Sequence, residues 1–322
     1  MDEEEQSGEG ILQPPWLLNG NEVYPRVVGV ITTLSSLYML LMAWKKHESL
    51  FQRLVFGMSF HLLLFGVFLM YGTNAIPSVD SYESGKGNIA TCTTQGFFIV
   101  VCRMSATLYY AGFSVYGYAG VLNNFNTAKI VWVEKYIHLL AHIYPLSIGI
   151  YFLVMQGYNN CGFGYCAVSS RPLGCQSASN DIDCERGHQD YKVMKGIYGF
   201  WLAFVLLFPT IVMVTLYIKV KQRQAQVNIR AKVVLLQSFV YLVVIYLTIV
   251  PWFVVLFIPI KRMQEIGKAN LVAMVIFSLF GLWSVLVYYY FTTNMSIISY
   301  KSKDASNATT SLSLSLTLTN HS

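Results

Sequence analysis

One arginine interrupts a long apolar segment, and its neighbours suggest a binding role. The segment reads NIATCTTQGFFIVVCRMSATLYYAG (residues 88–112), with Arg103 near its middle. On a helix, Thr107 and Tyr110 share the face of Arg103, a face of mainly small and polar groups that lies against protein or water rather than lipid. There Arg103 could hold an anionic group of a small ligand, or it could be a structural arginine bonded to carbonyls and tyrosines.

The other apolar segments contain no carboxylate to pair with this arginine. The nearest acidic residue, Glu134, is expected at the cytosolic foot of another helix. Arg103 therefore needs carbonyls, tyrosine hydroxyls, water or an anionic ligand as partners. We predict a ligand site of Arg103, Thr107 and Tyr110, with the structural role of Arg103 as the open alternative.

Two histidines have a spacing that could bind a metal ion, and a third lies in another predicted helix. His138 and His142 are one helical turn apart, and His61 lies in a different apolar segment. Such a pair without a carboxylate or cysteine beside it is more often structural, so we expect no metal site. The lack of carboxylates also argues against an intramembrane hydrolase. Residues 269–292 contain no lysine that could carry retinal, and we predict neither an enzyme nor a bound cofactor.

The composition shows which elements position these residues. The 322 residues are 55% hydrophobic and 12% charged, which is too apolar for a soluble domain. A membrane-spanning helix needs about 20 mostly apolar residues, and such segments predict an all-α membrane protein, a seven-helix bundle. The segments are residues 24–44, 54–72, 94–122, 136–157, 196–218, 233–258 and 269–292.

Charged residues beside the first segment predict its orientation. Lys45, Lys46 and Arg53 follow it, whereas Glu22 and Arg26 precede it. By the positive-inside rule the N-terminus then lies outside and the C-terminus in the cytosol. The third outer loop carries three basic residues against this rule.

This orientation divides the chain into three regions. Residues 1–23 form an extracellular tail, residues 24–292 the bundle, and residues 293–322 a disordered Ser/Thr-rich cytosolic tail. The net charge of +6 follows from the cytosolic loops and fits pairing with a lipid membrane surface rather than nucleic acid.

The cysteines support the same orientation. Five of the six fall in segments placed outside, where disulfides persist. Four of them lie in the long loop 158–195, which predicts a stapled loop, and the odd number leaves one free or paired between molecules. The five are Cys92, Cys161, Cys166, Cys175 and Cys184, whereas Cys102 lies within a helix.

Three predicted helices contain an interior proline, namely Pro145, Pro209 and Pro251. Proline removes a backbone hydrogen bond and kinks a helix. We expect these kinks to open space between helices.

Several stretches together resemble a receptor family. They are FQRLVFGMSFHLLLFGVFLMYGTNAIP, GNIATCTTQGFF, VEKYIHLL, YCAVSSRPLGC, LLQSFVYLVV and FGLWSVLVYYY. They look like the seven-helix G-protein-coupled receptor-like proteins of diatoms and related algae, which are distantly similar to cyclic-AMP-receptor and secretin-like receptors. The resemblance covers Phe51 to Tyr290 and is most specific at TC-x-x-QGFF, residues 91–98.

The resemblance implies a multi-pass plasma-membrane receptor that binds a small extracellular ligand in its bundle and signals to a heterotrimeric G protein. Activation would shift the fifth to seventh helices about Pro209 and Pro251. A transporter or anion channel with Arg103 in its pathway is the alternative.

The resemblance also implies that Cys92 bonds Cys166. Cys175 and Cys184 are then the expected second pair, and Cys161 is left over.

Three positions depart from the family pattern, and one of them is Ala167, where an aromatic is expected after the loop cysteine. His61 replaces an aspartate in the second helix, and Ser284 replaces an asparagine in the seventh. In the family these residues would form a polar core linking the two helices, so the usual switch is in question. His61 could make this element pH-sensitive, or it could be a neutral, hydrogen-bonded histidine.

The cytosolic side contains a short basic loop after the fifth helix. It could contact a G protein, or its charge could serve the positive-inside rule alone. Its candidate contacts are Lys219, Lys221, Arg223 and Arg230. In the tail, Asn307 and Asn320 head glycosylation motifs that carry sugar only if the tail lies outside.

Overall fold

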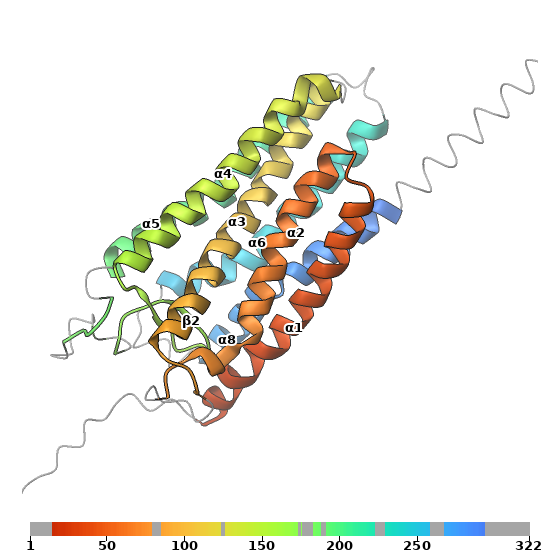
Figure 1. Ribbon diagram of the computed structural model, residues 1–322. Helices are drawn as coiled ribbons and strands as arrows, with labels where there is room; N and C mark the ends of the chain where they lie inside the picture. The colour runs from red at the N-terminus through yellow and green to blue at the C-terminus, as the bar shows by residue number, and fades with distance from the viewer. Residues whose placement is uncertain are drawn as a thin grey trace, which may run out of the picture.

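A computed structural model describes residues 15–78, 85–123, 126–172, 175, 183–187, 191–222, 229–257 and 267–293. Helices make up 82% of them. They pack side by side along one long axis, with a small hairpin at the end where α3 begins (Figure 1). The elements are α1 (Pro15–Lys45), α2 (Leu50–Met70), the 3-10 helix η1 (Gly72–Ala75), α3 (Ile89–Leu122), α4 (Thr127–Val154), β1 (Tyr158–Asn160), β2 (Cys166–Val168), α5 (Tyr191–Gln222), α6 (Ile229–Phe257), α8 (Gly267–Ser278) and a helix Phe280–Thr293.

Five of the described helices are long and apolar enough to cross a membrane. A sixth span is present if α8 and helix 280–293, which meet at a 44° bend, are taken together. In α6 the stretch Leu236–Trp252 is a shorter apolar helix. The prediction of a helical protein with several helices able to cross a membrane is confirmed, whereas seven spans and their orientation stay predictions.

The element boundaries correct two sequence predictions. The first helix begins at Pro15 rather than at residue 24, so residues 15–23 continue a helix instead of belonging to a tail. The last predicted span is interrupted after Ser278. Residues 1–14 and 294–322, with most of both predicted tails and both glycosylation motifs, lie outside the described residues.

Helix α3 lies at the centre of the bundle. Within its apolar window 89% of the residues are buried, compared with 28% for α4 and 33% for α5. A capping box begins the helix: Asn88 Oδ1 accepts from the amide of Thr91 at 3.0 Å, and Thr91 Oγ1 accepts from the amide of Asn88 at 2.8 Å. This arrangement fixes the start of α3 at Ile89, three residues before Cys92.

Small residues allow α1 and α2 to pack closely. A Cβ on Gly29 would lie 2.4 Å from the backbone nitrogen of Met70, and one on Gly66 would lie 2.6 Å from Oγ1 of Thr33. Close contact of this kind drives helix association in a membrane, where no hydrophobic effect acts between helices.

The loop after α4 folds back over the bundle. Strands β1 and β2 pair antiparallel, with Asn160 opposite Cys166, and a disulfide joins Cys166 to Cys92 of α3. Gln95 strengthens this attachment because its Oε1 accepts from the amide of Cys166 at 2.8 Å and its Nε2 donates to the carbonyl of Gly72 at 3.0 Å. The loop is therefore pinned over the start of α3.

A second disulfide joins Cys175 to Cys184. The structure thus contains both expected pairs. Cys161 and Cys102 are free thiols, half-buried and buried respectively.

Candidate functional site

The Arg103 side chain is buried in the bundle and has an incomplete set of partners. Only 4% of the residue is exposed. Its Nη2 donates to the carbonyl oxygen of Phe277 in α8 at 2.5 Å. Its Nε and Nη1 are buried and have no hydrogen-bond partner among the described residues. Arg103 therefore combines a structural bond to a carbonyl with two unused N–H groups.

Aromatic rings surround this guanidinium. Its central carbon lies 3.6 Å from the ring centre of Phe277, 4.8 Å from that of Phe280 and 5.2 Å from that of Phe65. The faces of aromatic rings attract a cation, most strongly where water is excluded. The rings stabilise the charge, but they cannot accept a hydrogen bond as an anion would.

The Arg103 bond lies beside the break between α8 and helix 280–293. A helix break leaves carbonyls without their usual amide donors, and other groups have to satisfy them. Here Arg103 of α3 donates to the carbonyl of Phe277, and Thr32 of α1 donates to the carbonyl of Ser278 at 3.2 Å. Two neighbouring helices thus hold the break in place.

The two other predicted ligand residues differ in role. Thr107 Oγ1 bonds back to carbonyls of its own helix, those of Arg103 at 3.1 Å and Met104 at 2.9 Å. The Tyr110 hydroxyl instead bonds Ser284 of helix 280–293. Arg103 and Tyr110 therefore both connect α3 to the broken helix, whereas Thr107 does not.

A row of aromatic contacts connects this site to α5 and α6. Trp252, directly after Pro251 in α6, stacks on Phe277 with ring centres 4.7 Å apart and planes 9° apart. Tyr198 of α5 packs on Trp252 at 5.9 Å. Phe277 and Trp252 could not be predicted as site residues from sequence, because their contacts arise only when the helices pack together. Pro209 lies inside α5, as predicted.

His61 and Ser284 do not form a polar link between the second and last helices. His61 bonds His142 of α4, while Ser284 bonds Tyr110. The buried link between α2 and helix 280–293 is instead a hydrogen bond from the Tyr288 hydroxyl to Oε1 of Gln52, 2.8 Å long.

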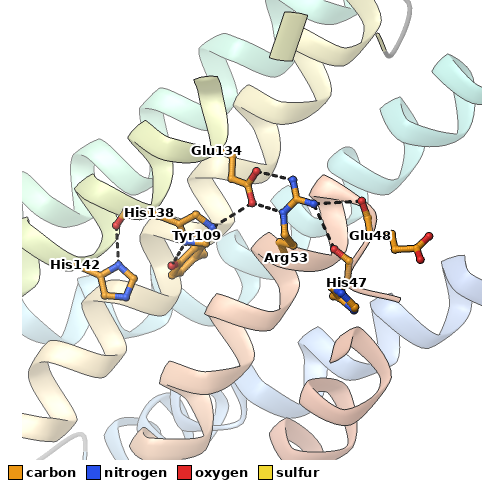
Figure 2. A network of polar contacts seen from close by, with 7 residues as sticks. All are labelled: His47, Glu48, Arg53, Tyr109, Glu134, His138 and His142. Carbon is orange, nitrogen blue, oxygen red and sulfur yellow. Dashed lines mark hydrogen bonds and ion pairs between the residues drawn. The ribbon is translucent and has the colours of Figure 1, made fainter. Parts of the chain in front are cut away.

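A second polar cluster lies between α2, α3 and α4 (Figure 2). Arg53 forms a two-pronged ion pair with Glu134, and the Tyr109 hydroxyl lies 2.6 Å from Nδ1 of His138. Among the described residues, no three His, Cys, Asp or Glu side chains are grouped so that they could hold a metal ion.

The predicted G-protein contacts are only partly described. Lys219 and Lys221 lie in the last turn of α5. Arg230 lies in the first turn of α6, and Arg223 lies outside the described residues.

No protein-family model and no curated protein matches this chain. Its function therefore has to be inferred from its residues and their geometry. Arg103 stands out among them, as a buried charge with two unused donors beside a broken helix.

Proposed function

We propose that this chain is a seven-helix plasma-membrane receptor of the G-protein-coupled type that binds a small anionic ligand at Arg103. The observation that carries the proposal is the pair of buried donors Nε and Nη1, which lack partners among the described residues. A buried polar group without a hydrogen bond is costly. A carboxylate or phosphate could accept from Nε together with Nη2, or from Nη1 together with Nη2, and so pair one of these donors and the charge.

The contacts of Arg103 provide a route by which ligand binding would change the packing of α6. An anion competes with the carbonyl of Phe277 for the guanidinium, so it weakens the bond that holds the helix break. Phe277 also stacks on Trp252, and movement there reaches the proline-kinked α6. A ligand that binds one packing better than another shifts the balance between them.

The loop over the bundle supports ligand entry from the outer side. The disulfide from Cys92 to Cys166 fixes the hairpin above α3, and Nδ2 of Asn21 donates to the carbonyl of Gly162 at 2.9 Å. Tyr165 belongs to the same buried apolar cluster as Phe65, whose ring faces Arg103. We propose that this loop covers the ligand site.

Aromatic residues at the opposite end support the proposed orientation. Trp44 and Trp132 are 65% and 60% exposed, and they lie beside Lys45 and Lys129. Exposed tryptophans mark the membrane interface, and lysines mark its cytosolic side. Lys219 and Lys221 would then face a cytosolic G protein.

The test compares Arg103→Gln with the unaltered receptor in cells. Small carboxylates and organic phosphates are applied, while G-protein activation and the amount of receptor at the surface are measured. We expect a response that Arg103→Gln abolishes at equal surface amount. Arg26→Gln is the matched control, because Arg26 donates to Thr73 and Asn74 at the outer end of the bundle.

An anion channel or transporter is the second candidate, since the same two donors could serve an anion in transit. Anion currents that persist in cells lacking G proteins, and that disappear in Arg103→Gln, would favour it over the receptor.

A further inference from the structure

Three side chains form a polar ladder along one face of α4. Glu134, His138 and His142 follow each other at intervals of four residues (Figure 2). Residues at this spacing lie above one another, about 6 Å apart along a helix. The ladder begins near the N-terminal end of α4 and leads from there toward the middle of the bundle.

The first member of the ladder is already paired. Glu134 accepts from Nε and Nη2 of Arg53 at 2.5 and 2.7 Å. Nη1 of Arg53 also donates to the carbonyls of Glu48 at 3.2 Å and His47 at 3.4 Å. This ion pair ties α2 to α4 and occupies the carboxylate that lies closest to the histidines.

The second member, His138, can accept a proton without losing a bond. Its Nδ1 lies 2.6 Å from the Tyr109 hydroxyl, and its Nε2 lies 3.7 Å from Glu134. The hydroxyl can donate to a neutral imidazole or accept from a charged one. Tyr109 reaches this position over Gly57, where a Cβ would lie 2.6 Å from the hydroxyl oxygen.

The third member, His142, forms a hydrogen-bonded pair with His61, and only one arrangement of protons fits this neutral pair. Nδ1 of His142 lies 2.7 Å from the carbonyl oxygen of His138, which only accepts, so this nitrogen carries a proton. In a neutral ring, Nε2 of His142 is then the acceptor. It lies 3.3 Å from Nε2 of His61, which must be the donor. The remaining His61 nitrogen, Nδ1, is buried without a partner among the described residues.

An added proton disrupts this pair at either ring. On Nε2 of His142 it would set two N–H groups against each other, and the hydrogen bond would be lost. On Nδ1 of His61 it would create a buried charge and a donor without an acceptor. The ionisable groups around the pair are His138, Glu134, Arg53 and Tyr109, and the carboxylate among them is held by Arg53.

We propose that His61 and His142 form a proton-binding site whose neutral form holds α2 to α4 and whose protonated form releases this contact. His142 lies at the exposed surface of α4, and His138 is the nearest ionisable group toward the end of the bundle where α4 begins. This site acts independently of a ligand at Arg103.

The test measures the distance between α2 and α4 as the pH changes. Spin labels are placed at Phe60→Cys and Leu139→Cys, two exposed positions on these helices, with Cys102 and Cys161 replaced by Ala. The full chain is studied in lipid nanodiscs between pH 8 and pH 5. We expect a second, longer distance to appear and its population to increase as the pH falls. For one proton, the ratio of the populations at the longer and the shorter distance changes by at most about tenfold per pH unit.

Variants decide where the proton binds. We expect His61→Gln and His142→Gln each to abolish the pH dependence, and the exposed His47→Gln to retain it. Nitrogen NMR of the imidazoles in the unaltered chain at pH 8 should show His142 with its proton on Nδ1. A distance that does not change with pH, or a change that only His138→Gln removes, would overturn the proposal.

Discussion

The Tyr288 hydroxyl of helix 280–293 donates to Oε1 of Gln52 in α2, and both side chains take part in a buried hydrogen bond of 2.8 Å. Tyr288→Phe removes the donor and leaves a buried acceptor unpaired, at a cost of about 1–3 kcal/mol. Gln52→Leu removes the acceptor. We expect the double variant to be less destabilised than the sum of the two single variants, because neither partner is then left unpaired.

Thermal unfolding of the purified variants in one detergent measures this difference. Tyr289→Phe is the matched control, because Tyr289 is 57% exposed on the next position of the same helix. Strictly additive effects of the two substitutions would show that the bond does not form.

The two disulfides should differ in their contribution to stability. The bond from Cys92 to Cys166 joins residues 74 positions apart, and the bond from Cys175 to Cys184 joins residues 9 positions apart. Chain entropy alone predicts about 4 kcal/mol for the first and about 3 kcal/mol for the second. The first also fixes the hairpin to α3, so its paired Ser variant should lose ligand response as well.

Stability and signalling of the two double-Ser variants check this prediction. We expect the Cys175→Ser/Cys184→Ser variant to keep a response when the other has lost it. Equal loss in both would show that the attachment to α3 has no special role.

The burial of Arg103 and Tyr110 could be predicted from sequence, but their partners could not. Helix α3 is buried on all sides from Ile99 to Ser114, so which of its faces binds a ligand stays a prediction. The carbonyl of Phe277 becomes available beside a break that no proline marks, in an apolar stretch that reads as one helix. Contacts from Arg103 and Thr32 hold that break, and such contacts exist only in the folded bundle.

The hydrogen-bond partner of His61 could not be predicted from the sequence either. Its position in the family pattern suggested a partner in the last helix, whereas it bonds His142. The available signal was that polar groups within apolar helices tend to pair with each other. That rule made the histidines of α4 candidate partners, but it could not rank them above Ser284.

The free thiol of Cys161 should react slowly in the folded protein. Burial raises the pKa of this thiol to about 12, and its Sγ donates to the carbonyl of Tyr165 at 3.1 Å. Only the thiolate is nucleophilic, so alkylation by iodoacetamide at pH 8 should be much slower than for an exposed thiol. Mass spectrometry of the labelled protein measures the alkylation rate, and unfolding the protein should raise this rate to that of an exposed thiol.

The same raised pKa makes stability depend on alkaline pH. The unfolded thiol loses its proton near pH 9, whereas the folded thiol keeps it. Stability from this group is therefore complete below about pH 9 and falls as the pH rises toward 12. Cys161→Ala should remove this part of the pH dependence. Labelling of Cys161 at the rate of an exposed thiol would contradict the raised pKa of this thiol.

Replacing Arg103 by methionine separates its two roles. Methionine has a similar length but no charge, so it removes two buried donors that lack partners along with the bond to Phe277. Removing an unpaired buried charge and two unpaired donors offsets the loss of the partner of one carbonyl. We expect Arg103→Met to unfold at the same temperature as the unaltered protein or higher, and to lose every response to anionic ligands.

Thermal unfolding in detergent and G-protein activation in cells provide the two measurements. Arg103→Lys keeps the charge but offers fewer donors in a different geometry, and should retain a weaker response. A large fall in unfolding temperature for Arg103→Met would instead identify Arg103 as a structural residue that holds the break beside Phe277. In that outcome the anion site, and with it the proposed receptor mechanism, would be wrong, whereas the proton site at His61 and His142 would be unaffected.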